Sequence, residues 1–337
     1  MKAMLLQGPR ELRLGDVEKP AASGDKVLVQ ITHSAICGTD LKIFEGEIPV
    51  AYPRIMGHEM CGEVIAGGDG TLRPGTRVMV DPSDYCGVCP VCYSGRTSIC
   101  PNGVLLGRDR NGGFAEYMAV PQRFLFPIPD SIDYETAPSI QVATTCLHSQ
   151  RTLNIFPGQT VVVMGLGVSG QIHAQMAKAR GATVIGVTRS AWKRQMAEKL
   201  GCDLTLASGP EAERGVLEAT HGLGADIVIE STGKLVALAS SIKMARRGGA
   251  LLCFGIITQK EGALPFYDLY FKELTVTNAR AAKSEDFPAT IEMVAKGHLN
   301  LKALVTHKMP LPELAPAIKM LEADIDGRMK VIIDHTN

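Results

Sequence analysis

Four cysteines lie within fifteen residues of this 337-residue chain, and their spacing suits the binding of a metal ion. Two residues separate Cys86 from Cys89 and Cys89 from Cys92, and Cys100 follows. Two intervening residues let neighbouring thiolates reach one ion, and four thiolates form a closed tetrahedral zinc site of the structural type. An iron–sulfur cluster also takes four thiolates, and buried or disulfide-bonded cysteines are a further alternative. We favour a structural zinc ion that stabilises a loop with little core of its own.

A second set of candidate ligands combines Cys37 with the neighbouring residues His58 and Glu59. Thiolate, imidazole and carboxylate groups all bind zinc, and three protein ligands with one open position are typical of a catalytic zinc site. However, His–Glu pairs are frequent, and a lone cysteine is most often a small buried hydrophobic residue. These residues alone therefore leave both interpretations open.

Residues 165–170 predict a dinucleotide-binding turn. They are Gly165, Leu166, Gly167, Val168, Ser169 and Gly170, a G-x-G-x-x-G pattern between an apolar run at 160–164 and a helix expected over 169–180. The first glycine makes the turn, the second lets a pyrophosphate approach the backbone, and the third lets the helix pack on the strand. The helix N-terminus would then face the phosphates. A tight turn without a ligand is the alternative.

The residues after the second strand of this region indicate which dinucleotide binds. An acidic residue there would bind the ribose of NAD, but the chain has Thr188, Arg189 and Ser190, with Lys193 and Arg194 a turn later. Arginine pairs well with phosphate, so we favour NADP over NAD. Because Lys193 and Arg194 also suit a solvated helix face, the prediction depends on Thr188 and Arg189.

The segments that must position these residues show two kinds of sequence pattern. Short apolar runs at 160–164, 183–187, 227–229, 251–254 and 274–277 alternate with helical patterns, which predicts an α/β fold with a doubly wound parallel sheet. The first 150 residues are rich in turn-forming residues and show the alternation of apolar and polar residues that is typical of short strands. The same pattern returns near residue 281. We predict a Rossmann cofactor-binding domain over 151–280 and a catalytic β domain formed by 1–150 and 281–337.

The composition excludes several function classes. Lys and Arg number 35 and Asp and Glu number 35, and this balance argues against a nucleic-acid or membrane-surface partner. No apolar run approaches the roughly 18 residues of a transmembrane helix, and the first residues lack the features of a signal peptide. Nine cysteines, an odd number, disfavour a disulfide framework and suggest a reducing compartment. We expect a cytoplasmic protein.

Taken together, the order and spacing of these motifs resemble the zinc-containing medium-chain alcohol dehydrogenase family, with the polyol, threonine and glucose dehydrogenase branch as the nearest match. The resemblance extends over the whole chain and includes segments 227–233 and 327–332. It implies a GroES-like β domain, a Rossmann domain, and hydride transfer between NAD(P) and a secondary alcohol, polyol or sugar. It also implies a homodimer or homotetramer that acts on small molecules.

The resemblance assigns roles to individual residues. Cys37 and His58 match the catalytic zinc ligands, Glu59 matches an acidic neighbour that can also ligate, and Thr39 matches the hydroxyl that passes on the alcohol proton. The four clustered cysteines match the structural zinc ligands, which gives two zinc ions per chain.

Two positions depart from the family pattern. Gln141 stands where a further catalytic zinc ligand is usual, and a neutral amide is a poor zinc ligand; we expect it to reach the metal or the substrate, with Cys146 as a less favoured substitute ligand. Lys42 replaces a proton-relay histidine, so the relay route stays open. The alternatives to a zinc dehydrogenase are a zinc-independent enone or quinone reductase, whose members usually lack both cysteine motifs, and a non-enzymatic cofactor-binding protein.

Overall fold

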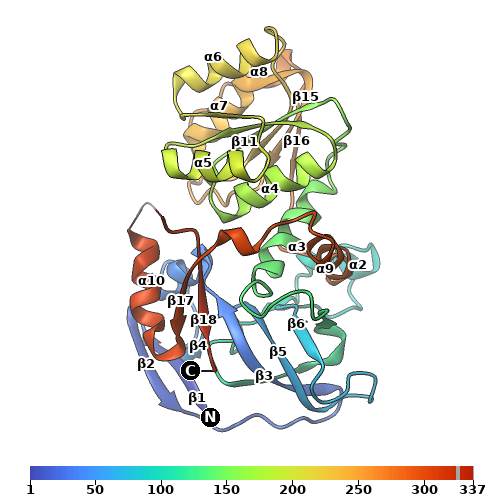
Figure 1. Ribbon diagram of the computed structural model, residues 1–337, viewed down its shortest axis with the longest axis vertical. Helices are drawn as coiled ribbons and strands as arrows, with labels where there is room; N and C mark the ends of the chain where they lie inside the picture. Colours follow the sequence, from blue (N-terminus) through green and yellow to red (C-terminus); the bar gives the residue numbers. More distant parts are fainter. Residues whose placement is uncertain (324–326, 337) are drawn as a thin grey trace. The chain divides into compact units, whose positions relative to one another are not determined.

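The computed structural model describes residues 1–323 and 327–336 and divides into two compact units. Unit 1 consists of Met1–Thr144, Ala281–Lys296 and Leu301–Asn337, and unit 2 of Thr145–Arg280 and Gly297–Asn300. Figure 1 shows the mixture of strands and helices, which confirms the predicted α/β class. In the described part of the chain, no helix combines the length and the apolar character needed to cross a membrane.

Unit 1 is built around a seven-stranded sheet in which β3 has a central place. The order is β10-β6-β5-β3-β18-β17, and β9 also pairs with β3. One edge of β3 is shared by β9, opposite residues 26–30, and β18, opposite residues 33–35, while β5 takes the other edge. The strands are β3 (Lys26–Ala35), β5 (Glu59–Gly67), β6 (Arg77–Val80), β9 (Tyr117–Pro121), β10 (Leu125–Pro127), β17 (Val305–Pro310) and β18 (Lys330–Asp334).

Smaller elements complete unit 1. A three-stranded sheet has the order β2-β1-β4, and β7 pairs with β8. The further strands are β1 (Lys2–Gly8), β2 (Glu11–Asp16), β4 (Arg54–Ile55), β7 (Ser83–Asp84) and β8 (Val104–Leu105), and the helices are α1 (Gly38–Glu45), α2 (Pro90–Tyr93), α9 (Phe287–Ala295) and α10 (Leu314–Glu322). Helix α3 (Ser139–Gln150) contains the boundary between the units. Two apolar clusters, one within the large sheet and one under α1 and α10, form the core.

A buried carboxyl group, Asp81, follows β6 and ties it to the later segment of unit 1. Asp81 is 1% exposed, accepts a hydrogen bond of 2.6 Å from the Ser284 hydroxyl, and accepts another of 2.9 Å from the Ser83 backbone N–H. Burial raises the pKa of Asp81 to about 7, because removal from water disfavours the charged form. Below about pH 7 the folded chain therefore carries Asp81 mainly in its protonated form.

This shift predicts a pH-dependent loss of stability. Because the folded pKa lies above the unfolded value, the contribution of Asp81 is fully present below about pH 4 and is lost as the pH rises through about 7. We expect Asp81→Asn to gain stability over wild type between pH 4.5 and pH 8 by about 3 kcal/mol, at about 1.4 kcal/mol per pKa unit. Thermal unfolding at both pH values measures this gain. Asp25→Asn, at an exposed site, is the control, and an Asp81→Asn difference that does not change with pH would contradict the prediction.

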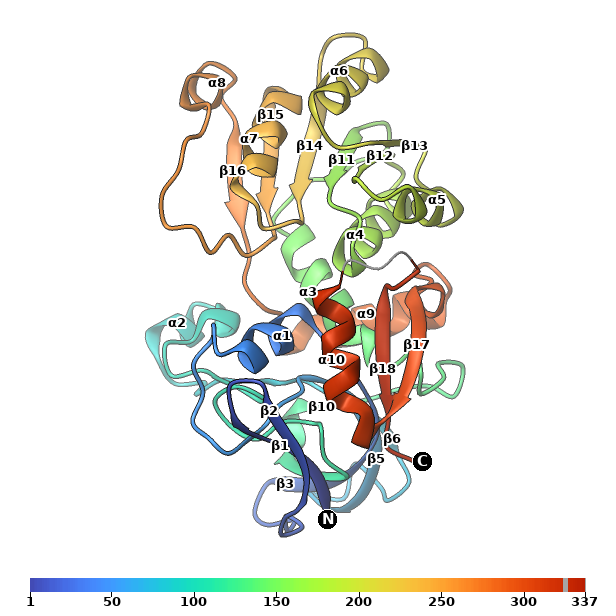
Figure 2. The ribbon, with the colours of Figure 1, turned by 90° about the vertical axis from the view of Figure 1, so that its left-hand side faces the viewer.

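Unit 2 contains a six-stranded parallel sheet in the order β13-β12-β11-β14-β15-β16, which Figure 2 shows from one edge to the other. The strands are β11 (Thr160–Met164), β12 (Thr183–Val187), β13 (Leu204–Leu206), β14 (Ala225–Glu230), β15 (Ala245–Cys253) and β16 (Thr275–Asn278). The helices are α4 (Val168–Ala179), α5 (Ala191–Lys199), α6 (Pro210–Ala219), α7 (Leu235–Met244) and α8 (Phe266–Phe271). The predicted Rossmann fold is confirmed.

Alternating side chains of the strands bury both faces of this sheet. Val161 and Val163 of β11 pack in a cluster with residues of α4 and α5, whereas Val162 and Met164 pack with residues of α6 and α7. Strands covered on both faces are expected to be continuously apolar, which is why the runs were visible in the sequence. The edge strand β13 was not predicted, because it has three residues and is only half-buried.

Candidate zinc and dinucleotide sites

Unit 1 brings together Cys37, His58 and Glu59. Cys37 follows β3 and is the N-cap of α1, while His58 and Glu59 lie where β5 begins. Because β3 and β5 are antiparallel and Ala35 lies opposite Glu59, the sheet register places these two segments next to each other. One ligand atom from each of the three residues lies within 4.8 Å of the other two, and both His58 and Glu59 are buried. This donor set fits a zinc ion.

The carboxylate of Asp40, which the sequence analysis did not single out, connects the first two of these residues. Asp40 is fully buried, and its Oδ2 accepts a hydrogen bond of 2.8 Å from the backbone N–H of Cys37. Its Oδ1 lies 3.3 Å from Nδ1 of His58, close enough for a charge interaction although the atoms are not aligned for a hydrogen bond. A carboxylate behind a ligating histidine fixes the orientation of its ring. The capping-box spacing from Cys37 to Asp40 was the available signal.

The electrostatics of the cluster favour a cation. Burial opposes the charged imidazolium, but Asp40 and Cys37 outweigh this effect and raise the pKa of His58 well above its usual range. Glu59 contributes a second carboxylate, whose Oε1 is buried without a hydrogen-bond partner. A buried acceptor without a partner is costly, and a metal ion would satisfy it.

The other oxygen of Glu59 has a partner that comes from far along the chain. Oε2 of Glu59 forms a buried salt bridge with Nζ of Lys330 on β18, which also donates a hydrogen bond of 3.3 Å to the carbonyl oxygen of Ile36. No signal in the sequence indicated this pair, because 271 positions separate the two residues and the strand order decides their contact.

The remaining predicted catalytic residues lie on two helices. Thr39 and Lys42 are both half-buried on α1, three positions apart, and Oγ1 of Thr39 is 3.9 Å from Sγ of Cys37. Gln141 is buried in the first turn of α3. Cys146, further along α3, belongs to unit 2, where its thiol faces the carbonyl oxygen of Ser169 at 3.7 Å. That contact disfavours Cys146 as a zinc ligand.

The four clustered cysteines have their sulfur atoms within 4.8 Å of one another. Sγ of Cys100 lies 3.5 Å from that of Cys86 and 3.8 Å from that of Cys89. Tetrahedral thiolates at the usual Zn–S distance of about 2.3 Å are about 3.8 Å apart, whereas a disulfide is about 2.0 Å long. All nine cysteines are free, so the disulfide alternative is wrong. Thiolates on different irons of a cluster would stand further apart, so the geometry favours one zinc ion.

Residues 86–100 are called the four-cysteine lobe below. Hydrogen bonds favour the thiolate form of one of its cysteines. The backbone N–H of Val88 and the amide of Asn102 lower the pKa of Cys86 to about 6. Burial has the opposite effect on Cys92 and raises the pKa of that thiol to about 12. Cys86 therefore ionises far more readily than Cys92, and a bound cation would favour the thiolate form of both.

In unit 2, residues 165–167 form the turn between β11 and α4, and residues 168–170 begin α4. Gly165 has φ +92°, and a Cβ atom there would lie 2.5 Å from Cγ2 of Thr232. A Cβ on Gly170 would lie 1.8 Å from the carbonyl oxygen of Gly165, whereas one on Gly167, the N-cap of α4, would meet nothing within 4 Å. The first and third glycines are thus required by packing, and the second leaves room for a ligand.

The segment after β12 is held by its own backbone contacts. Ser190 is the N-cap of α5 and its hydroxyl accepts a hydrogen bond from the backbone N–H of Lys193. The guanidinium of Arg194 donates to the carbonyl oxygens of Thr188 (3.0 Å) and Arg189 (2.9 Å). Arg194 therefore orders this loop, and Arg189, which is exposed, remains the cation expected to bind a phosphate.

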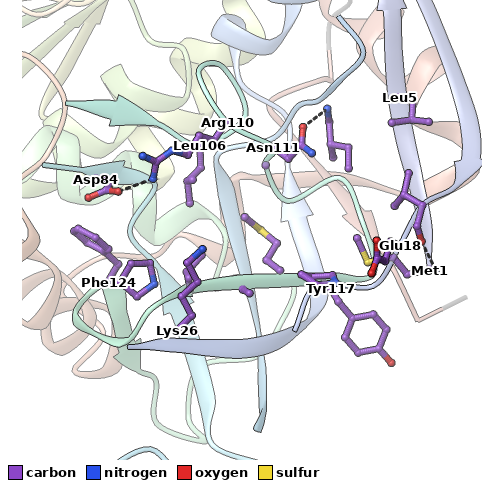
Figure 3. A pocket seen from close by; sticks show the side chains of 18 of the residues that line it. Met1, Leu5, Glu18, Lys26, Asp84, Leu106, Arg110, Asn111, Tyr117 and Phe124 are labelled. Atoms are coloured by element: carbon purple, nitrogen blue, oxygen red, sulfur yellow. Dashed lines mark hydrogen bonds and ion pairs between the residues drawn. The ribbon is translucent and has the colours of Figure 1, made fainter. Parts of the chain in front are cut away.

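A cavity of unit 1 lies apart from the candidate zinc ligands. Figure 3 shows this space of about 410 Å³, with Met1, Leu5 and Phe124 among the apolar residues and an ion pair between Arg110 and Asp84. Its lining contains none of the predicted zinc ligands. This cavity therefore does not mark the candidate chemistry.

Comparison with known proteins supports the assignment of a GroES-like domain and of a dehydrogenase cofactor domain. The alcohol dehydrogenase GroES-like domain matches residues 23–130 and the zinc-binding dehydrogenase family matches residues 168–296. L-galactonate-5-dehydrogenase of Escherichia coli (strain K12) is 34% identical, with 98% of this chain and 97% of the relative covered. D-arabitol-phosphate dehydrogenase of Enterococcus avium is 30% identical, with 99% and 97% covered. The solved structure of a zinc-binding dehydrogenase from Sinorhizobium meliloti 1021 bound to NADP has a TM-score of 0.92 and 32% identity, with 99% and 98% covered.

The fold and these relatives define an NAD(P)-dependent oxidoreductase that acts on alcohol groups. The chain belongs to the zinc-containing medium-chain alcohol dehydrogenase family, in its polyol dehydrogenase branch. The family and the fold class predicted from the sequence are thereby confirmed, and the zinc-independent reductase and the non-enzymatic protein are set aside.

Proposed function

We propose that this chain oxidises a secondary hydroxyl group of a polyol or sugar derivative, with NADP as hydride acceptor and with two zinc ions per chain. The observation that carries the proposal is the convergence of Cys37, His58 and Glu59 in unit 1 of a chain whose unit 2 holds the glycine-rich turn. Relatives that act on L-galactonate and D-arabitol phosphate support the substrate class. The four cysteines 86, 89, 92 and 100, whose sulfur atoms lie close together, would hold the structural ion.

In this proposal, different residues of unit 1 bind the catalytic ion, orient its ligands and accept the proton of the substrate hydroxyl group. Cys37, His58 and Glu59 would hold the catalytic ion, which supplies Lewis acidity that lowers the pKa of a coordinated hydroxyl. Asp40 keeps the imidazole of His58 in place. Thr39 borders the cluster, and its Oγ1 would accept the proton of the substrate hydroxyl while its own hydroxyl proton passes to the cofactor ribose and on to solvent.

Lys42 and Gln141 are proposed to bind the substrate. Lys42 lies on the same face of α1 as Thr39, because residues three apart are neighbours on a helix. Gln141 is a buried amide that offers both a donor and an acceptor to a polyhydroxylated molecule.

In unit 2, the pyrophosphate would lie over Gly167, and Thr188, Arg189, Ser190 and Lys193 would surround the 2′-phosphate. We expect Arg189→Gln to weaken NADP binding by about tenfold, the effect of losing one charge-assisted contact, with little change for NAD. Titration of both reduced cofactors by nicotinamide fluorescence measures this ratio. Arg214→Gln, at an exposed arginine of α6, is the matched control. Equal losses for the two cofactors would contradict the assignment of Arg189.

We also propose a homo-oligomer. Strand β16 pairs only with β15, so its other edge is open in the described chain. Beside it in sequence, helix α8 exposes four aromatic side chains, Phe266, Tyr267, Tyr270 and Phe271, at 66%, 72%, 77% and 49%. Open edges and exposed apolar side chains of this size mark interaction surfaces.

The nine free cysteines support a reducing compartment, the cytoplasm.

The function is tested by counting zinc and then measuring turnover. Elemental mass spectrometry on native protein is expected to give about two zinc ions per chain, and a panel of polyols, sugar acids and their phosphates with NADP and NAD should then show reduction of the cofactor. About one zinc per chain, with no turnover on any secondary alcohol, would overturn the proposal.

A further inference from the structure

One cation of unit 1 lies where water does not reach. Lys330 is 3% exposed, and among residues 1–323 and 327–336 no other lysine or arginine is buried. It lies on β18, a strand whose residues are all buried. Burial of an ammonium group costs free energy of folding unless the group is paired, so the partners of Lys330 indicate its role.

Those partners are the two segments that carry the candidate zinc ligands. The ammonium group forms a salt bridge with Oε2 of Glu59, and it donates a hydrogen bond to the carbonyl oxygen of Ile36, the residue before Cys37. Oε1 of Glu59 remains buried and without a hydrogen-bond partner. One carboxylate is therefore divided between a fixed cation on one side and the Cys37–His58 cluster on the other.

We propose that Lys330 is a positioning residue that limits how strongly Glu59 binds the catalytic zinc ion. The ammonium group competes for the carboxylate, and its positive charge disfavours a second cation nearby. Without an ion, the same group compensates the charge of Glu59, so the site keeps its form while it is empty. Lys330 thereby lowers the affinity of the site for zinc below the affinity that the three ligands alone would give. This inference rests on the proposed function of the Cys37–His58–Glu59 cluster.

The test is the release of zinc from the two sites of native protein into an excess of a coloured chelator. We expect Lys330→Met to slow release from the catalytic site by about 10- to 100-fold, the range in which partners of metal ligands change affinity. Lys330→Gln, which keeps a donor for the Ile36 carbonyl but no charge, should act in the same direction. Lys330→Arg, which keeps the charge, should stay within about threefold of wild type.

A double variant separates this role from simple packing. In a Glu59→Gln background the carboxylate charge is absent, so Lys330→Met should no longer slow zinc release. Release from the four-cysteine lobe serves as an internal control and should be the same in all variants.

The outcomes distinguish the inference from the proposed function. Unchanged or faster release from the catalytic site in both Lys330→Met and Lys330→Gln would overturn the inference while the proposed function stands. An effect of equal size in the Glu59→Gln background would also overturn it. If the wild-type chain held zinc only in the four-cysteine lobe, the proposed function and the inference would both fail.

Discussion

Replacement of Cys37 or His58 by alanine is expected to lower alcohol oxidation by at least about a thousandfold. Each change removes one of three protein ligands, and a zinc site that retains two ligands neither holds the ion firmly nor presents an open position in a fixed place. Loss of the ion removes the Lewis acid, so the effect should fall on kcat as well as on zinc content. The zinc count should drop from about two to about one per chain.

The matched controls are Cys202→Ala and His298→Ala. Cys202 is a buried cysteine and His298 an exposed histidine, both in unit 2 and outside the sites described above. Their zinc content and turnover should stay close to wild type. If Cys37→Ala retained two zinc ions and most of its activity, the assignment of this cluster would be wrong.

Replacement of Cys92 by serine is expected to remove the other zinc ion and to unfold the lobe around it. The segment from Cys86 to Cys100 contains only the short helix α2 and one 3-10 turn, and three of its apolar side chains, Val88, Tyr93 and Ile99, are exposed. Structural zinc contributes on the order of 10 kcal/mol to small domains of this kind. The segment therefore has little besides the ion to keep it ordered.

Limited proteolysis and zinc analysis measure this effect together. We expect cleavage within residues 86–100 to accelerate at least about a hundredfold, with the catalytic zinc still bound. Cys202→Ala again controls for the loss of a cysteine as such. Wild-type resistance to cleavage in Cys92→Ser would show that packing, not zinc, orders the lobe.

Sites whose chemistry depends on local spacing could be predicted from the sequence. Two residues lie between neighbours among the cysteines 86, 89 and 92, and the glycines 165, 167 and 170 lie within six residues, so their contacts are set by neighbours along the chain. The strands of unit 2 were visible because burial on both faces makes them continuously apolar.

Contacts that depend on strand order could not be predicted in this way. Lys330 reaches Glu59 only because β18 pairs with β3, and nothing within either segment specifies that neighbour. The direction of a long side chain was equally hidden, since Arg194 turns to the carbonyl oxygens of its own loop although its position suited a phosphate. Asp40 was close to Cys37 in sequence, but its contact with His58 requires the pairing of β3 with β5.

The pairing of β18 with β3 has a consequence for the way the protein is made in a cell. Lys330 is translated 271 residues after Glu59, which at about 5–20 residues per second is roughly 15 to 55 seconds later. Residues 145–280 of unit 2 are continuous and complete within that interval, whereas residues 33–35 of β3 still lack their partner strand. A nascent chain thus presents an open strand edge next to Cys37 for most of its synthesis, and such edges attract other chains. Refolding of the finished chain has no such interval, so chaperones should improve the yield of newly made protein more than that of refolded protein.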